Sequence, residues 1–439
     1  MKTKASKPVR SRAILGLPLR RGLTLRRAVP VGGALAALAA GTLLHLERQR
    51  GVPVWNSLWA EDGQVFLSGA IRNFRGTFFA QNGGYVHVVP RVIAGIVAAL
   101  PLHEAAAGMA VGAAAVVALV AGFVYVASSE VVPSRSPRLA LAAAVLLVPV
   151  PGSELLANAT NLHFYLLFAC FWALLWQSET PFALGSRAAV VVATALSDPL
   201  SALFLPLAIV APLARRSVRA LVVSGLFLSA LVVQLAIIAG GARPERNWGF
   251  RLGALPEIFA LRVAGGLLVG DRFLGDLWDG FGRAFAYGAL LLVAAVIALL
   301  LRRSDRRTIA FALIALGYAG LFFCVQLVGR GTGGMDPDLH GFRLNAARYI
   351  LLPFLLVMSV IVVLAGRRLW TRRAALVWIA ALLTLNYSVT SDRSRGPRWD
   401  RELARARRVC TTTGKRTAKV LVAPSPPHVW FATIPCRRT

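Results

Sequence analysis

Two adjacent carboxylates, Glu61 and Asp62, are the residues whose type and position most readily suggest chemistry. They follow the first hydrophobic stretch of a chain that has 49 Lys and Arg residues but only 19 Asp and Glu. A carboxylate within about 3 Å of a substrate hydroxyl can act as a general base. Such a pair can also contribute oxygen ligands to a divalent cation, Mg²⁺ or Mn²⁺. The structural alternative is an acidic cap in the first turn of a helix.

Other polar residues lie near the ends of apolar stretches, where they could bind a substrate. They are Tyr85, His87, Arg91, Asn161, His163, Asp198, Arg343 and Arg348. Arginine binds phosphate oxygens in a bidentate way, which makes Arg91 and Arg348 candidate phosphate ligands. An arginine at a helix boundary can instead extend into lipid headgroups. Asp198 precedes Pro199, so it either begins the next helix as a cap or serves as a functional ionisable group in the membrane.

The composition indicates a polytopic membrane protein. Hydrophobic residues make up 57% of the 439 positions, charged residues make up 15%, and the mean hydropathy is +0.64. Soluble globular domains have about 25% charged residues. The net charge of +30 is divided into short clusters between apolar runs rather than one basic surface. This pattern favours membrane topology and contact with anionic lipid over binding to nucleic acid.

Eleven apolar stretches are candidates for membrane spans, since a helix of roughly 20 residues crosses a bilayer core. They cover residues 28–46, 105–127, 139–150, 162–176, 188–196, 200–213, 220–239, 285–301, 308–328, 349–366 and 374–387. A twelfth stretch, 88–102, contains Pro90 and Arg91 and is about 15 residues long. We expect it to lie at the outer interface or to re-enter without crossing.

Eleven spans satisfy the distribution of positive charge. Nine Lys and Arg residues within 1–27 place the amino terminus in the cytoplasm, and the arginine clusters at 215–219, 302–307 and 367–373 then also lie there. Twelve spans would export the later clusters. The expected organisation is a basic cytoplasmic segment 1–27, a transmembrane domain 28–387 with exported loops 47–104, 240–284 and 329–348, and an exported tail 388–439.

We expect the protein to lie in the plasma membrane, and its tail has features of a small exported unit. Cys410 and Cys436 bracket its second half and are predicted to form a disulfide, which requires an oxidising exterior. Two unrelated thiols are the alternative. Residues 418–422 and 429–434 read as strands separated by a proline-rich turn. Cys170 and Cys324 fall within apolar stretches and read as packing residues.

This layout resembles the GT-C superfamily of membrane glycosyltransferases. The resemblance rests on the acidic pair beyond the first span, the interfacial continuation and the small exported tail. Within the superfamily, the chain is similar to actinobacterial membrane proteins that share Glu-Asp, Gly-Tyr-x-His-x-x-Pro-Arg, Asn-Leu-His and Arg-Tyr motifs. The resemblance implies an all-α fold and transfer of a sugar, with inversion, from a polyprenyl-phosphate donor to a glycan, lipid or protein acceptor at the outer face.

The resemblance maps the general base most directly onto Asp62, with Glu61 as the variant. The residues alone do not choose between the two carboxylates. The departing lipid phosphate would need positive groups where little water penetrates. Two other classes stay open: a transporter or lipid flippase that depends on Asp198, and a non-catalytic protein of envelope assembly. The chain has no phosphate-cradling loop, His-Glu-x-x-His or Cys-x-x-Cys motif.

Overall fold

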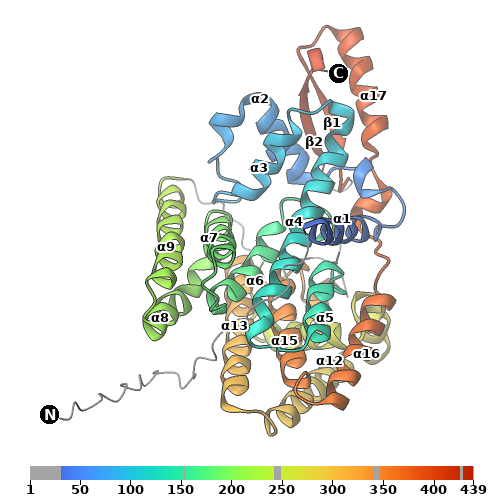
Figure 1. Ribbon diagram of the computed structural model, residues 1–439. Coiled ribbons are helices and arrows are strands. Elements are labelled where there is room, and N and C mark those ends of the chain that lie inside the picture. Colours follow the sequence, from blue (N-terminus) through green and yellow to red (C-terminus); the bar gives the residue numbers. More distant parts are fainter. Residues whose placement is uncertain (1–30, 153, 242–248, 341–345, 426–428, 439) are drawn as a thin grey trace, which may run out of the picture.

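The computed structural model describes residues 31–152, 154–241, 249–340, 346–425 and 429–438 (Figure 1). The described chain is mainly helical and has a two-stranded antiparallel sheet near the carboxyl terminus. The α-helices are α1 Val31–Leu46, α2 Ser68–Thr77, α3 Val88–Val97, α4 Ala105–Ala127, α5 Arg135–Leu146, α6 Leu162–Leu175, α7 Pro181–Ala195, α8 Leu205–Arg215, α9 Val218–Ala239, α10 Ala254–Ile258, α11 Gly266–Val269, α12 Asp271–Leu301, α13 Arg306–Arg330, α14 Pro337–His340, α15 Arg348–Ala365, α16 Leu369–Leu385 and α17 Trp399–Thr413.

Short helical turns and two strands complete the fold. The 3₁₀ turns are η1 Val54–Asn56, η3 Leu102–Glu104, η4 Ser128–Glu130, η5 Pro199–Phe204, η7 Asp392–Arg395 and η8 Cys436–Arg438. The π-helices are η2 Asp62–Leu67 and η6 Phe259–Gly265. Strands β1 Thr417–Val422 and β2 Trp430–Pro435 confirm the two strands predicted in the tail. π-Helical turns are rare and often occur at functional sites.

Within the described ranges, five helical segments are long and apolar enough to cross a membrane. They are Leu102–Glu130, Val218–Ala239, Asp271–Leu301, Arg306–Arg330 and Arg348–Ala365. The outer helices expose large apolar side chains, including Leu221, Val232 and Leu291, whereas α15 is buried from Ile350 to Ala365. Exposed apolar surface on helices that surround a buried apolar helix is typical of a protein whose outer surface meets lipid.

The remaining predicted spans coincide with shorter helices. α1, α6 and α7 have 16, 14 and 15 residues, and α5 has 12. At a rise of 1.5 Å per residue, these helices extend about 18–24 Å, which is less than a bilayer core of about 30 Å. Their length alone therefore does not establish eleven spans. Helix α3 has ten residues, about 15 Å, and is likewise too short for a straight crossing.

Local sequence signals explain where several helices begin. Thr180, Ser217 and Asp305 each accept a hydrogen bond from the backbone amide three residues later, and they cap α7, α9 and α13. Gly282 has φ 51° and ψ −131° and kinks α12, a conformation that favours glycine. The kink separates the polar first part of α12 from the apolar part that was predicted to begin at residue 285.

The connections between the long helices gather at two opposite ends of the bundle. At one end, Arg367 contacts Asp305 at 2.8 Å, Arg372 donates to Ser134, and Arg219 donates to the Glu179 backbone. These contacts tie together the turns that carry the arginine clusters. The first loop, the α5–α6 loop and the carboxyl-terminal unit lie at the other end, which is the upper end in Figure 1.

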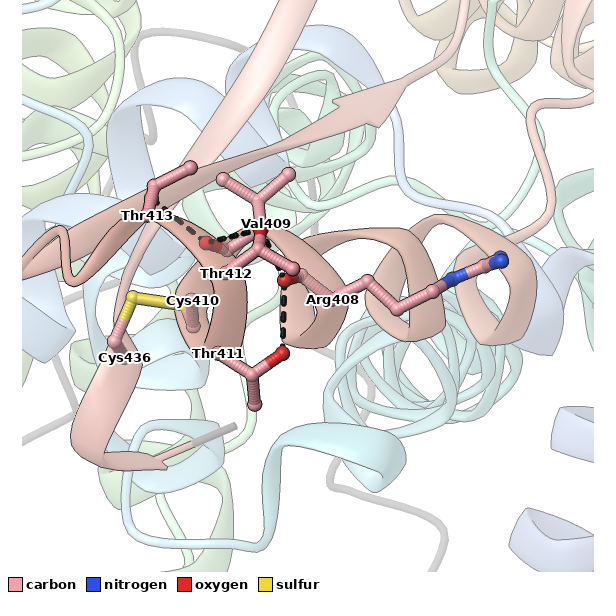
Figure 2. The surroundings of a disulfide bond; sticks show 7 residues. All are labelled: Arg408, Val409, Cys410, Thr411, Thr412, Thr413 and Cys436. Atoms are coloured by element: carbon pink, nitrogen blue, oxygen red, sulfur yellow. Dashed lines mark hydrogen bonds between the residues drawn. A yellow bond between two sulfur atoms is a disulfide. The ribbon is translucent and has the colours of Figure 1, made fainter.

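The carboxyl-terminal unit packs on the loop that carries the acidic pair. Ala423 donates to the Leu58 carbonyl at 2.9 Å, and Thr433 donates to the Ser68 hydroxyl at 2.8 Å. A Cβ atom at Gly63 would lie 2.8 Å from Val422 Cγ1, so this close approach requires glycine. In the structure Cys410 and Cys436 form a disulfide that joins the end of α17 to the end of β2 (Figure 2). The tail and the first loop thus form one unit.

Arg393 fixes the position of this unit. Its side chain is 2% exposed and donates five hydrogen bonds. The acceptors are the carbonyls of Val54, Ser57, Leu156 and Ala157 and the Ser57 hydroxyl. Burial lowers the pKa of Arg393 to about 10, so the guanidinium remains charged at neutral pH. One side chain of the tail therefore holds two loops that lie more than 200 residues earlier in the chain.

Substitution of Arg393 by Gln should destabilise the protein more than substitution of Arg395 by Gln. Arg393→Gln leaves buried carbonyl groups without donors, and breaking a buried charged network costs roughly 3–5 kcal/mol. Arg395 is exposed and provides the matched control. We expect the apparent melting temperature in detergent to fall by about 5 °C or more for Arg393→Gln and to change by about 1 °C or less for Arg395→Gln. Equal melting temperatures would contradict the role of Arg393.

Candidate functional site

Asp62 is buried, and its carboxylate is occupied by hydrogen bonds. Oδ2 accepts from the Ala159 amide at 2.8 Å, and Oδ1 accepts from the Thr160 amide at 2.9 Å and the Thr160 hydroxyl at 2.6 Å. Asp62 is only 1% exposed. These donors come from the α5–α6 loop rather than from the helix that begins at Asp62, so the carboxylate does not act as a cap. Asp62 instead joins the first loop to residues 159 and 160.

Glu61 has a different environment from its neighbour. Its side chain is partly exposed, and within the described chain its carboxylate accepts only from its own backbone amide. The charges of Arg348 and Glu154 act on it, which places the three side chains close together. Burial, reinforced by Asp62 and Glu154, raises the pKa of Glu61 above its ordinary value. An accessible carboxylate with a raised pKa is suited to accept a proton near neutral pH.

The α5–α6 loop brings a third carboxylate to this site. Glu154 is 8% exposed and contacts Arg348, with 2.5 Å between Oε2 and Nη1. Its backbone carbonyl accepts from the amide groups of Asn158 and Asn161, and Asn158 in turn accepts from the Asn161 backbone amide. Asn161, predicted to bind substrate, is thus buried and holds the loop. The loop positions both Glu154 and the two residues that bind Asp62.

Arg348 lies beside a small pocket of about 40 Å³ that is partly open to solvent. The described residues that line it are Arg330, Gly331, Gly334, Met335, Ala346, Arg348 and Tyr349. Arg348 is 28% exposed, and its guanidinium lies 4.9 Å from the centroid of the Tyr349 ring. Two arginines beside one solvent-accessible pocket can bind an anionic group such as a phosphate.

A second cluster, formed by Tyr85, His87, His163 and Asp198, is buried next to this pocket. His163 Nδ1 lies 2.6 Å from Asp198 Oδ2, while Asp198 Oδ1 accepts from the Leu200 amide at 2.8 Å. Asp198 therefore caps η5, and its other carboxylate oxygen contacts an imidazole; a functional role for its charge stays a prediction. The His87 ring centroid lies 4.3 Å from that of Tyr85 and 5.3 Å from that of His163.

One imidazole of this cluster, that of His87, presents a hydrogen-bond acceptor. His87 Nε2 lies 3.1 Å from the Asn82 carbonyl, which only accepts, so Nε2 carries the proton. Burial, followed by the charge of His163, lowers the pKa of His87 well below its ordinary range and keeps the ring neutral. His87 Nδ1 is then a buried acceptor without a partner in the described chain. Such a group is suited to a hydroxyl donor from a ligand.

Tyr85 connects the cluster to the pocket. A Cβ atom at Gly83 would lie 3.8 Å from both Tyr85 Cε1 and Arg330 Nη2, so the two side chains flank this glycine. The charges of Arg330 and Arg348 also act on the Tyr85 hydroxyl. The carboxylates, the arginines and the histidines therefore form one polar region at the same end of the helix bundle.

Arg91 is placed differently from the other predicted ligands. It is 3% exposed, and its guanidinium donates to the carbonyls of Val65 and Ala80 at 3.3 and 3.2 Å. It also lies 5.0 Å from the centroid of the Phe66 ring. These contacts hold η2 against the following loop, and Arg91 is not among the described residues that line the pocket. Arg343, the other predicted phosphate ligand, lies outside the described residues.

The side chains around Glu61 and Asp62 do not resemble a preformed metal site. Among the described residues, no three His, Cys, Asp or Glu side chains are grouped so that they could hold a metal ion. The Asp62 oxygens accept N–H and O–H donors, which a cation would have to displace. Glu154 binds Arg348, which lines the pocket, and the charge of Arg348 acts on Glu61. Binding of Mg²⁺ or Mn²⁺ at Glu61 and Asp62 stays a prediction.

Several residues of this site were not identified from the sequence. Glu154 and Thr160 position the acidic pair, and Arg330 lines the pocket. Glu154 is one of only 19 acidic residues and lies between two apolar stretches, which was a usable signal. The role of Thr160 depends on a contact with a residue 98 positions away, and no local pattern indicates it.

Comparisons with protein-family models, curated proteins and solved structures find no match for this chain.

Substitution of Glu61 by Gln should stabilise the protein above the ordinary pKa of a glutamic acid. Because the folded-state pKa is raised, ionisation of Glu61 opposes folding once the pH exceeds the ordinary pKa of 4.5. The wild type loses stability as pH rises through the folded-state pKa, whereas Glu61→Gln lacks this loss. We expect the difference in melting temperature to favour Glu61→Gln at pH 8 and to shrink towards pH 4.5. Destabilisation by Glu61→Gln across this range would contradict the proposed environment.

Proposed function

We propose that this chain is an integral membrane glycosyltransferase that uses a polyprenyl-phosphate-linked sugar at the outer face of the plasma membrane. The observation that carries the proposal is the partly exposed Glu61 carboxylate close to Arg348, beside a pocket that Arg330 also lines. A proton acceptor next to two cationic groups suits a reaction in which a hydroxyl attacks and a phosphate departs. The resemblance to the GT-C superfamily supports this choice of reaction.

In the proposed reaction, an acceptor hydroxyl attacks the anomeric carbon of the donor sugar. The new carbon–oxygen bond forms as the bond from the anomeric carbon to the phosphate oxygen breaks, with inversion. Glu61 takes the hydroxyl proton, and the polyprenyl phosphate leaves with the bonding electron pair. Arg330 and Arg348 stabilise the negative charge on the phosphate. Arginines that already lie beside the pocket need little rearrangement to do so.

The choice of Glu61 rather than Asp62 as general base follows from their hydrogen bonds. Three donors from residues 159 and 160 occupy Asp62, and a hydrogen-bonded carboxylate is a weaker proton acceptor. Asp62 is assigned a positioning role, since it holds the first loop against the loop that carries Glu154. His87 Nδ1 presents an acceptor that suits a hydroxyl group of a sugar.

The arrangement of the helices supports a membrane orientation for this site. Helix α1 leads into the first loop, and the five long apolar helices follow it in the chain. With the expected eleven spans, the turns rich in arginine would lie in the cytoplasm and the site outside, as the positive-inside rule requires. The exposed apolar sides of the outer helices would contact lipid, and the polyprenyl chain of the donor could lie along them.

Substitution of Glu61 by Gln should reduce sugar transfer by about 10²–10⁴-fold, the usual contribution of a general base. Glu104→Gln is the matched control, because Glu104 lies on the same loop and is exposed. The measurement is transfer of labelled sugar from a panel of polyprenyl-phosphate sugars by the protein in nanodiscs, with Mg²⁺, with Mn²⁺ and with a chelator. Full activity of Glu61→Gln, or a wild type that neither binds nor consumes any donor, would overturn the proposal.

A transporter or lipid flippase is the second candidate, favoured by the buried Asp198–His163 pair between α6 and the break at η5. An ionisable pair in a broken helix can couple transport to protons. Asp198→Asn and Glu61→Gln separate the two functions. Lipid translocation in proteoliposomes that depends on Asp198 but tolerates Glu61→Gln would favour transport. If cells tolerate both changes without a defect in the envelope, the chain is a non-catalytic assembly protein.

A further inference from the structure

Helix α17 and the segment that follows it carry an excess of positive charge. From residue 399 to residue 438 there are nine Lys and Arg residues, while the acidic residues are Asp400 and Glu402. Asp400 is paired with Arg398 at 3.0 Å, and Glu402 lies 3.4 Å from Arg405. Most of the positive charge on this exposed unit therefore has no acidic partner among the described residues.

Three of these arginines form what we call the basic face of α17. Arg401, Arg405 and Arg408 are spaced four and three residues apart, so their side chains lie on one side of the helix about 5–6 Å from each other. All three are exposed, and the Arg405 side chain is 68% exposed. Figure 2 shows Arg408 extending away from the Cys410–Cys436 disulfide. The opposite side of the helix packs through Trp399, Leu403 and Ala406.

The basic face weakens the helix in the absence of a partner. Like charges three or four residues apart repel each other on a helix, and α17 carries two such contacts in succession. Of these three arginines, Arg405 forms an ion pair with an acidic side chain of the described helix, at an exposed position where such a pair contributes little. A bound polyanion would remove this repulsion.

The position of α17 separates the basic face from the lipid headgroups. The Trp399 indole donates to the Leu102 carbonyl at 2.8 Å, and Leu102 begins a candidate membrane span. From there α17 extends away from the helix bundle (Figure 1). Arg405 and Arg408 lie six and nine residues beyond Trp399, about 9 and 14 Å at 1.5 Å per residue. A headgroup layer is only about 5–8 Å thick, so these arginines reach the aqueous phase.

The disulfide indicates which aqueous phase this is. Disulfides persist in oxidising compartments, and the Cys410–Cys436 bond therefore places the basic face outside the cytoplasm. The same unit packs on the loop that carries Glu61 and Asp62. A polyanion outside the cytoplasm that extends beyond the headgroups is a polymer of the cell envelope rather than lipid or nucleic acid.

We propose that the basic face of α17 binds an anionic glycan polymer, with carboxylate or phosphate groups contacting Arg401, Arg405 and Arg408. Guanidinium groups bind both kinds of oxyanion in a bidentate way. Several exposed charges spaced along a rigid helix suit a linear polymer better than a single small anion. This binding is independent of the proposed sugar transfer, because none of these arginines lines the pocket.

The experiment uses the full chain in nanodiscs of phosphatidylcholine, with polygalacturonate as the probe and neutral dextran as the negative control. The triple variant Arg401→Gln, Arg405→Gln, Arg408→Gln should weaken binding of polygalacturonate at least tenfold. The matched control, Arg302→Gln, Arg303→Gln, Arg306→Gln, removes the same charge from exposed arginines at the opposite end and should change the affinity less than twofold. Added salt should weaken the wild-type interaction.

Equal weakening by the two triple variants would overturn the proposal, since it would show that net charge alone drives binding. Tighter binding to vesicles of phosphatidylglycerol or to single-stranded DNA would overturn the assignment of a glycan. Protection from phenylglyoxal, measured by mass spectrometry on the wild type, provides a readout that needs no variant. Polygalacturonate should protect Arg405 and Arg408 and leave Arg302 and Arg303 reactive, and the reverse pattern would also overturn it.

Discussion

The buried carboxylate of Asp62 is the interaction on which the upper end of the molecule depends. It receives three hydrogen bonds from residues 159 and 160, and Arg393 binds the adjacent carbonyls of Leu156 and Ala157. A buried ion is stable only when its hydrogen bonds are satisfied. The α5–α6 loop is therefore held between an anion and a cation, and its position determines where Glu154 and His163 lie.

In this arrangement, some charged side chains hold the fold together, and one carboxylate stays free to react. Asp62, Glu154, Asp198 and Arg393 each bind groups from other segments, so their positions are fixed. In the described part of the chain, Glu61 is the carboxylate of this region whose hydrogen bond comes only from its own amide. A rigid frame of paired ions around one partly exposed acid preorganises a site, because the frame does not need to rearrange when a reaction changes the charge at that acid.

Hydropathy predicted where the helices lie, because length and apolar composition are local properties of α4, α9, α13 and α15. Alternation and turn residues likewise predicted β1 and β2. The sequence identified Glu61 and Asp62 as candidates but did not show which of them is the general base. The hydrogen bonds that distinguish them come from residues about 100 positions away. Arg393 looked like one of many basic residues of the tail, and only its burial against the first loop reveals its function.

The bonds of Arg393 to the first loop also constrain the order in which the protein can mature. Arg393 and Ser57 are 336 residues apart, and the five long apolar helices lie between them. At a synthesis rate of about 5–20 residues per second, Arg393 is synthesised roughly 20–70 seconds after the first loop. During this interval the buried acceptors and the Asp62 carboxylate must remain hydrated. A polypeptide that stops before the tail would therefore insert its helices but leave the acidic loop unassembled, which gives the cell a simple chemical distinction between complete and truncated copies.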